Sequence, residues 1–451
     1  MAKTSKSAGI YTLGCKVNQY ESEAIAEELQ RQGVEVLPPT EVCDAYIINT
    51  CTVTAESDRK ARQFIRRAVS RNPQAVIVVT GCLAQTAPES LLRIAGVDAV
   101  VGNTEKLAAA KETVRLLDTD CKSSEQVCRV SDIDACGFES MAITTFERTR
   151  AYVKIEDGCE SRCTYCIIPA ARGKIRSKPP DDVVAEVTAL TENGCREVVL
   201  TGIETASYGK DLGHCDLAEL LARIDRIPGI GRVRLGSLDP SLIRPAFVER
   251  IAGLGSLSPH FHLSLQSGSS RILALMKRKY NAEQAMNAIR LLRERMPGVQ
   301  FTTDVIVGFP GETEEDFRET VNFVERAEFL MVHIFPYSKR QGTPAAQMSG
   351  QIPEEVKRRR LHELEEVVRA GHRRILENAL RIRPRREVLF ESYENGYAYG
   401  HTDDFLEVAV PVSKPLHGRL ETVLLKKTDG VVCFGELIGA EGGAMYARRD
   451  S

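Results

Sequence analysis

The sequence has no tryptophan, and none of its apolar runs approaches the roughly 18 residues that a membrane-spanning helix needs. Its first residues are polar and are not followed by the extended apolar segment of a signal peptide. Neither positive nor negative charge predominates, since the sequence has 60 Lys and Arg and 62 Asp and Glu. We therefore expect a cytoplasmic protein with no membrane partner, in which any nucleic acid is held by local basic patches.

Motifs of several common enzyme classes are also absent. There is no GxxxxGK[ST] phosphate-binding loop, no serine nucleophile motif and no acid–base dyad. With 451 residues the chain has length for about three domains and needs no disulfides to hold a core. Its 13 cysteines, an odd number, indicate thiolate ligands, reactive thiols or plain buried residues rather than a disulfide framework.

Hydrophobic patterning divides the chain into α/β and all-β parts. Residues 1–117 alternate short strands with helices, which predicts an open parallel sheet, and the polar segment 118–147 is predicted to be a linker. Residues 148–380 hold a second such series that ends in a basic helix, and 381–451 a small all-β barrel of a type that often binds oligonucleotides. The strand candidates of the second series are 152–156, 197–201, 233–237, 260–265, 301–307 and 331–335. Six units are fewer than the eight of a closed TIM barrel, so we expect an open, partial (β/α)6 barrel.

A compact cysteine motif follows the first strand of this second series. Cys159, Cys163 and Cys166 form a CxxxCxxC triplet, of which only about 0.01 are expected by chance at this cysteine frequency. A structural zinc ion normally takes four protein ligands, whereas three close thiolates suit a 4Fe-4S cluster with one open iron. S-adenosylmethionine can chelate that iron and be cleaved to a radical. The motif resembles that of the radical S-adenosylmethionine (radical SAM) superfamily.

Three further cysteines are far apart in the sequence but occupy equivalent places. Cys15, Cys51 and Cys82 each follow a predicted parallel strand. Because the carboxyl ends of parallel strands meet at one edge of an open sheet, these thiols are candidates for a second three-thiolate cluster. The alternative is that they are small buried apolar residues. The remaining cysteines are expected to be plain thiols: Cys43, Cys121, Cys128, Cys136, Cys195, Cys215 and Cys433.

Both cysteine sets in this order resemble the methylthiotransferase family, which has an auxiliary-cluster domain, a radical SAM barrel and a C-terminal TRAM barrel. Segments 14–22 (GCKVNQYES) and 335–340 (FPYSKR), with Gly342-Thr343-Pro344, are similar to its MtaB branch. The segments RTRA at 148–151 and LQSGS at 265–269 add to the likeness. Ala170 and the stretch Glu204-Thr205-Ala206 depart from the branch pattern.

The resemblance implies a transferase that converts N6-threonylcarbamoyladenosine at position 37 of tRNA, next to the anticodon, to its 2-methylthio derivative. It implies two 4Fe-4S clusters, one on Cys159, Cys163 and Cys166 and one on Cys15, Cys51 and Cys82. It also implies two uses of S-adenosylmethionine, an electron donor such as flavodoxin or ferredoxin, and a sulfur and iron-sulfur supply system. The alternatives are methylthiolation of isopentenyladenosine tRNA or of a ribosomal-protein aspartate, and a non-catalytic iron-sulfur protein that binds RNA and senses redox state.

Polar residues near strand ends of the second series are candidates for binding the cofactor. They are Tyr165, Ser237, Asp239, Gln266, Ser267, Asp304 and Gly308. Candidates for contact with RNA or substrate are Lys16, Asn18, Arg172, Lys174 and Arg176. His260 and His262 share a strand face and are expected to be core or pocket-wall residues. Two further basic clusters, on the helix after Cys51 and at 357–386, could hold RNA phosphates.

Overall fold

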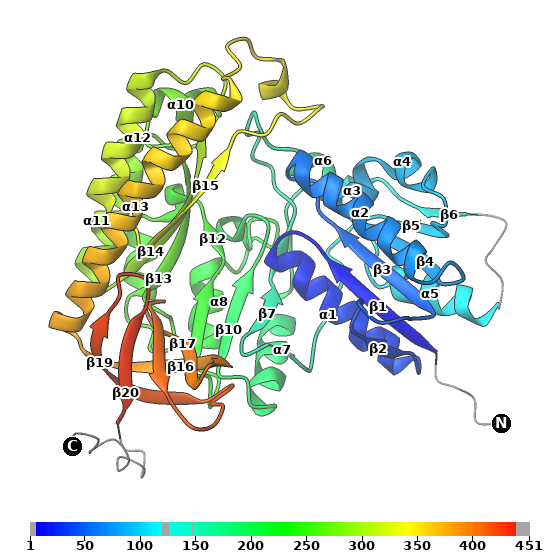
Figure 1. Cartoon of the computed structure of the whole chain (residues 1–451), viewed down its shortest axis with the longest axis horizontal. Coiled ribbons are helices and arrows are strands. Elements are labelled where there is room, and N and C mark those ends of the chain that lie inside the picture. The colour runs from blue at the N-terminus through cyan, green and yellow to red at the C-terminus, as the bar shows by residue number, and fades with distance from the viewer. Residues whose placement is uncertain (1–5, 120–125, 147, 439–451) are drawn as a thin grey trace, which may run out of the picture.

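A computed structural model describes residues 6–119, 126–146 and 148–438, so Cys121 lies outside the described residues. The chain forms an N-terminal α/β unit, a larger central α/β unit and a small barrel beneath the central unit (Figure 1). Within the described residues, no helix combines the length and apolarity needed to cross a bilayer.

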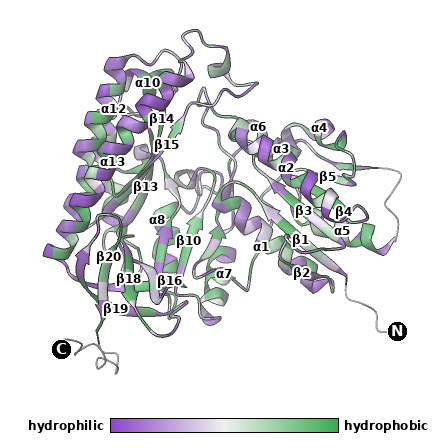
Figure 2. Cartoon of the chain, viewed as in Figure 1, coloured by the Kyte–Doolittle hydropathy of each residue, from purple (hydrophilic) through white to green (hydrophobic). Residues whose placement is uncertain are grey.

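The N-terminal sheet is parallel, with strand order β2-β1-β3-β4-β5-β6. All residues of β3 and β4 are buried, as expected for a sheet covered on both faces (Figure 2). The strands are β1 (Ser7–Thr12), β2 (Glu35–Leu37), β3 (Ala45–Thr50), β4 (Val76–Gly81), β5 (Ala99–Val101) and β6 (Val127–Arg129). The helices are α1 (Lys16–Arg31), α2 (Ala55–Arg71), α3 (Cys82–Thr86), α4 (Pro88–Leu92) and α5 (Ala108–Asp118). The predicted open parallel sheet is confirmed.

The segment predicted to be a linker contributes to this architecture. Strand β6 pairs with β5 in parallel, and the backbone carbonyl of Met141 accepts a 2.7 Å hydrogen bond from the Tyr20 hydroxyl of α1. The strand is three residues long, too short for its sequence to show a period-2 pattern. We therefore propose that the first domain extends through β6 rather than ending at residue 117.

The central unit is the predicted open, partial barrel. Its parallel strands form a three-stranded sheet, β7-β10-β11, and a four-stranded sheet, β12-β13-β14-β15. The strands are β7 (Ala151–Lys154), β10 (Glu197–Thr201), β11 (Arg232–Leu235), β12 (Ser237–Leu238), β13 (His260–Gln266), β14 (Gln300–Val307) and β15 (Met331–Pro336), with a short pair β8 (Glu156–Asp157) and β9 (Arg176–Ser177). The helices are α6 (Ile168–Arg172), α7 (Pro180–Glu192), α8 (Leu217–Ile224), α9 (Pro245–Ile251), α10 (Ser270–Leu275), α11 (Ala282–Arg295) and α12 (Glu314–Ala327).

The long helix α13 (Glu354–Ile382) runs along the central unit and leads into the C-terminal barrel (Figure 1). The strands β16 (Arg385–Glu394), β17 (Tyr397–Thr402), β18 (Glu407–Pro411), β19 (Leu420–Thr428) and β20 (Cys433–Leu437) close in the order β16-β17-β18-β20-β19. Closure leaves no free sheet edge, and this small barrel is consistent with a TRAM domain.

The C-terminal barrel closes the lower end of the partial barrel. The ring of Phe405, between β17 and β18, stacks on His260 and on His401, each with ring centroids 4.6 Å apart. Arg234 of β11 lies 4.9 Å from the centre of the same ring and donates to the backbone carbonyl of Asp403. His260 begins β13, so this contact covers the amino-terminal ends of the strands. The carboxyl ends, where ligands bind, point the other way.

Candidate active site

The auxiliary triad, defined as Cys15, Cys51 and Cys82, gathers at the carboxyl edge of the N-terminal sheet. The three residues follow β1, β3 and β4. Burial raises the pKa of Cys51 to about 11, and the nearby thiols of Cys82 and Cys15 add to the rise. At Gly14, whose φ is +105°, a Cβ atom would lie 2.8 Å from that of Cys51, so glycine keeps the triad open.

The radical triad, defined as Cys159, Cys163 and Cys166, lies in the loop between β8 and α6. The Cys159 amide donates to the Gly173 carbonyl at 2.9 Å, which folds this loop back on itself. At Gly158 a Cβ atom would collide with the carbonyl oxygen of Lys174. Burial raises the pKa of Cys166 to about 11, with smaller increases from Cys163 and then from Cys82 of the other triad.

The two triads therefore face each other across the domain boundary. Helix α3, which begins at Cys82, packs against α6, which begins two residues after Cys166. Arg172, at the end of α6, donates from Nε to the Cys82 sulfur at 3.3 Å. Asn103 lies 3.7 Å from the same sulfur through Nδ2 and donates to the Ala171 carbonyl at 2.7 Å. A residue of the radical SAM domain thus touches a ligand candidate of the auxiliary site.

The chemistry of these donors fits two iron-sulfur clusters. Each triad offers three free thiols, the donors that iron-sulfur clusters use, and three thiolates would leave one iron of a 4Fe-4S cluster for another ligand. Cys51 and Cys166 are thiols at neutral pH, so metal binding must release their protons. We propose that the auxiliary triad and the radical triad each hold one cluster.

A buried ionic network joins the two domains beside Cys82. Arg172 is fully buried and pairs with Glu21 of α1 at 2.5 Å and with Asp157 at 3.1 Å. Lys154 pairs with the same carboxylates at 2.8 and 2.7 Å, and Lys106 reaches Glu21 at 3.2 Å. Although burial opposes it, these cations, Arg172 foremost, hold the pKa of Glu21 well below its usual value. Arg176 also lies 3.7 Å from Asp157, so four cations face two carboxylates, and the excess positive charge near Cys82 would favour an anionic cluster.

The network changes the interpretation of three predicted RNA or substrate contacts. Arg172, Asn18 and Arg176 are all buried, so they cannot reach RNA. Asn18 accepts from Arg172 at 2.6 Å and donates to the carbonyls of Leu13 and Thr50. Arg176 donates to the carbonyls of Ile133 and Arg172. Sequence shows the basic stretch but not its neighbours, whereas Lys174 and Lys16 are exposed and stay available.

Several predicted cofactor residues cluster next to the radical triad. Asp239 pairs with Arg278 at 3.0 Å, and Arg278 donates to the Cys163 sulfur at 3.3 Å. Tyr165 is half-buried, and Arg278, Cys163 and Cys166 all influence its pKa, which burial raises well above the usual value. Ser237 is half-buried at the start of β12 and Gln266 at the end of β13, where its φ is +69°.

The other predicted cofactor residues are engaged elsewhere. Ser267 is fully buried, and its hydroxyl lies 3.3 Å from that of Thr320 and accepts from the Ser269 amide. Gly308 has a φ of +73° and faces Lys357 of α13, which a Cβ atom would strike. Asp304 points into the partial barrel beside two histidines, in an arrangement described below.

Sequence patterning missed three residues at the radical triad. Glu204 lies 3.0 Å from the Cys159 sulfur and pairs with Lys279 at 3.0 Å, and Arg278 contacts Cys163. Glu204 follows the end of β10, so the strand-end rule that found the cysteines could have found it. Arg278 and Lys279 come from the loop after α10, where no periodic signal marks them.

Comparisons with known proteins agree with this geometry. The profile described as the radical SAM superfamily matches residues 153–324, and that described as uncharacterized protein family UPF0004 matches residues 7–102. A threonylcarbamoyladenosine tRNA methylthiotransferase MtaB from Bacillus subtilis is 40% identical over 93% of this chain and 94% of its own length. The Thermotoga maritima MtaB is 42% identical over 80% of this chain and 81% of its length.

A relative with a different named product and a solved structure are also similar to this chain. A tRNA-2-methylthio-N(6)-dimethylallyladenosine synthase from Carboxydothermus hydrogenoformans is 39% identical over 80% of this chain and 83% of its length. The fold is similar to that of the radical S-adenosylmethionine methyltransferase TsrM from Kitasatospora setae, with a TM-score of 0.54 and 18% identity over 76% of this chain and 75% of that one. Two 4Fe-4S clusters and S-adenosylmethionine are the cofactors that membership implies. The chain belongs to the MtaB-type family of radical S-adenosylmethionine tRNA methylthiotransferases.

Proposed function

We propose that this enzyme replaces the C2 hydrogen of N6-threonylcarbamoyladenosine, at position 37 of tRNA, by a methylthio group. The observation that carries the proposal is the facing of the two triads, in which α3 packs on α6 and Arg172 of α6 contacts the Cys82 sulfur. A reaction that joins a radical step to sulfur insertion needs both sites within reach of one substrate atom. The names of the MtaB relatives supply the modified nucleoside.

The bound cofactors would supply an electron, a 5′-deoxyadenosyl radical, a methyl group and the sulfur. The chain's own residues orient these groups and exclude water. Arg278 and Glu204 contact the radical triad, while Arg172 and Asn103 contact the auxiliary one. We further propose that a flavodoxin or ferredoxin donates the electron, that an iron-sulfur supply system restores the sulfur, and that the enzyme works in the cytoplasm, where its tRNA substrate is.

Substrate choice gives the direct test of this proposal. Reduced enzyme carrying both clusters is incubated with tRNA bearing either threonylcarbamoyladenosine or isopentenyladenosine, and mass spectrometry identifies the methylthio nucleosides. We expect product from the first tRNA and at least 100-fold less from the second, because a pocket built for polar groups leaves them unpaired beside a prenyl chain. Equal conversion of both, or product from the prenylated tRNA alone, would overturn the proposal.

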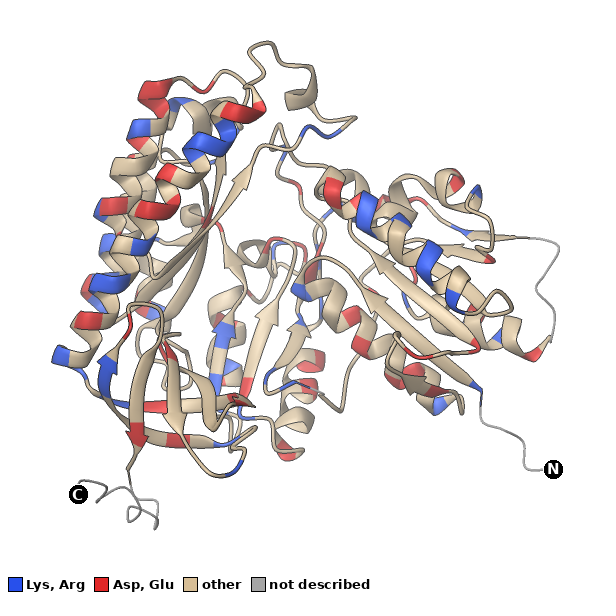
Figure 3. Ribbon diagram, viewed as in Figure 1, with Lys and Arg blue, Asp and Glu red and all other residues tan. Residues whose placement is uncertain are grey.

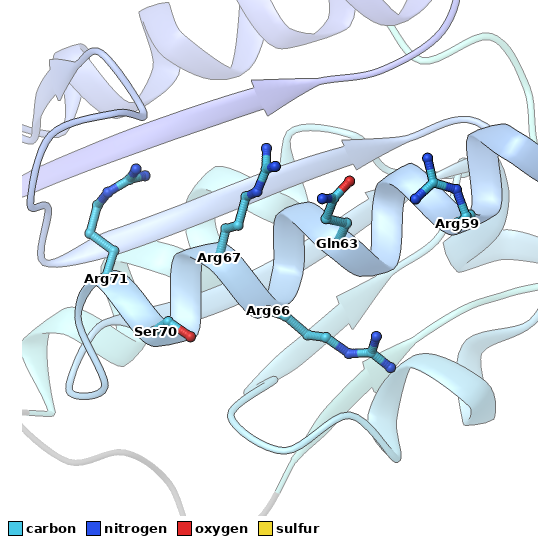
Figure 4. A pocket seen from close by; sticks show the side chains of 6 residues that line it. All are labelled: Arg59, Gln63, Arg66, Arg67, Ser70 and Arg71. Atoms are coloured by element: carbon cyan, nitrogen blue, oxygen red, sulfur yellow. The ribbon is translucent and has the colours of Figure 1, made fainter.

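The tRNA is proposed to lie along α2, whose exposed face carries a row of arginines (Figures 3 and 4). The row consists of Arg59, Arg67 and Arg71, with Gln63 between them, and Arg66 projects from the other side of the helix (Figure 4). Helix α2 begins four residues after Cys51, so the row leads away from the auxiliary triad. Arg66 and Arg67 are exposed, and no ion pair with another described residue neutralises them.

Replacing Arg66 and Arg67 by alanine should weaken tRNA binding and reduce the slope of log K against log salt by about two, one for each phosphate that an arginine no longer neutralises. Filter binding at several salt concentrations measures both effects. Arg290→Ala on α11 is the matched control, because Arg290 is equally exposed on a different helix. An unchanged slope in the double variant would show that the tRNA does not bind along α2.

A further inference from the structure

Three polar side chains meet inside the partial barrel. His262 of β13, Asp304 of β14 and His333 of β15 each bring one side-chain nitrogen or oxygen within 4.8 Å of the others. The Nε2 atom of His262 lies 3.2 Å from Asp304 Oδ2. Its Nδ1 atom lies 3.0 Å from the Thr302 hydroxyl, which also contacts His260 at 3.0 Å. Thr302 thus fixes the His262 ring so that Nε2 faces the lumen.

Strand geometry sets the direction of these three side chains. The residues that adjoin these three in sequence, such as Phe261 beside His262 and Val305 beside Asp304, are buried in the hydrophobic core. His262 and Asp304 are only half-buried and His333 is exposed, because alternate residues of a strand point to opposite faces. Asp304 and His333 are direct register partners. The group therefore lines the inner face of the barrel.

Lys16 approaches this group from the N-terminal domain. It follows Cys15 of the auxiliary triad directly, is exposed, and forms no ion pair or hydrogen bond through its ammonium with any residue between 6 and 438 that the structure describes. Its charge interacts with that of Asp304, although the two are too far apart to pair.

The two arginines whose charges act on Lys16 already have a carboxylate partner. Arg150 and Arg234 both pair with Glu197, at 2.5 and 2.9 Å. These charges lower the pKa of Glu197 to about 2 against the opposing effect of burial, so it stays ionised. An anion that enters the lumen would therefore meet Lys16 as its available partner.

The same inner face also offers apolar surface. Phe335 and Met331 of β15 alternate with the buried Val332 and are 47% and 38% exposed, unusual for large apolar side chains. A flat aromatic surface two residues from His333 suits a stacked base, because stacking on aromatic rings is a common mode of base binding.

We propose that Lys16, His262, Asp304 and His333 form the binding site for the N6 substituent of the substrate adenosine, which rests on the function proposed above. Lys16 pairs with the substituent's carboxylate, Asp304 accepts from its N–H or hydroxyl groups, and the histidines bind its remaining oxygens. Phe335 supports the base. An isopentenyl group would offer no polar partner to Lys16 or His333, and none to the paired His262 and Asp304.

A metal ion is the other ligand that two histidines and one carboxylate suggest. The electrostatics of this site favour the anionic substituent, since the charge of Lys16 acts on the site and Asp304 is the one carboxylate within the group. The anionic substituent is therefore the proposed ligand, and the test below also detects a bound metal ion.

The test measures affinity for anticodon stem-loops that carry either threonylcarbamoyladenosine or its methyl ester, which lacks the negative charge. The enzyme carries both clusters, and S-adenosylmethionine is omitted. Wild type should prefer the acid by roughly 10-fold to 100-fold, as one charge-assisted hydrogen bond gives. Lys16→Met should bind both ligands alike, Lys16→Arg should restore part of the preference, and His333→Ala should weaken both. Lys111→Met, an exposed lysine on α5, is the control and should keep the wild-type ratio.

The ratio of two affinities separates recognition from general damage, which would weaken both ligands equally. A preference retained in Lys16→Met would overturn this inference, as would one equivalent of Zn²⁺ bound by wild type and lost in His333→Ala. If wild type instead converts only prenylated tRNA, the proposed function itself fails. If wild type converts the threonylcarbamoyl substrate but Lys16→Met still prefers the acid over the methyl ester, this inference fails and the proposed function stands.

Discussion

Simultaneous replacement of Cys15, Cys51 and Cys82 by alanine should halve the iron content, from about eight atoms to about four, and abolish methylthio formation. Reductive cleavage of S-adenosylmethionine should persist, because the radical triad sits on a separate loop with its own partners, Arg278 and Glu204. Replacing Cys159, Cys163 and Cys166 should remove the other half of the iron and all cleavage. Iron analysis and 5′-deoxyadenosine release measure the two effects.

The matched control replaces cysteines that are buried but lie in neither triad. Cys195 and Cys433 are both fully buried, one just before β10 and one in the C-terminal barrel. Their double alanine variant should keep the full iron content, with a modest loss of stability from the vacated space. A full iron complement in the variant without Cys15, Cys51 and Cys82 would mean that those thiols hold no cluster.

Replacement of Arg172 by glutamine should cost several kcal/mol of unfolding free energy, since removing one member of a buried ionic network typically costs about 3 to 5 kcal/mol. Glu21 and Asp157 would lose a partner, and the Cys82 sulfur would lose a donor. Urea unfolding measures the effect on the metal-free protein. Arg115→Gln on α5 is the control and should cost less than about 1 kcal/mol, because Arg115 is half-exposed and its partner Glu112 keeps Arg129.

Acid sensitivity gives a second measurement on the same variant. The depressed pKa of Glu21 contributes stability that is present above about pH 4.3, its usual value, and is lost as the pH falls through the folded-state pKa. Without Arg172 the folded-state pKa rises, so acid unfolding should begin at higher pH than in wild type. Identical acid midpoints would show that Arg172 does not control the ionisation of Glu21.

The sequence predicts site residues that are closely spaced in a motif or that follow equivalent strands of a repeated strand–helix unit. The CxxxCxxC motif is local, and Cys15, Cys51 and Cys82 follow β1, β3 and β4, which are neighbours in the sheet, so the places of both triads in the fold were predictable. The role of Arg172 was not, because its partners Glu21 and Cys82 lie in another domain and only folding brings them together. His262 illustrates an intermediate case. Its strand and face were predicted, but its meeting with His333 depends on the order of the strands.

The contact of Phe405 with His260 has a consequence for experiments that shorten the chain. Residues 385–438 are a natural target for truncation, since a TRAM-like barrel is expected to bind RNA. Removing them would also uncover the guanidinium groups of Arg232 and Arg234 and let water enter the barrel from below. Lost activity in a truncated enzyme would then report the opened barrel as well as any lost RNA contact. Point variants on the outer surface of the C-terminal barrel, rather than deletions, therefore separate its expected RNA binding from its role in closing the lower end of the partial barrel.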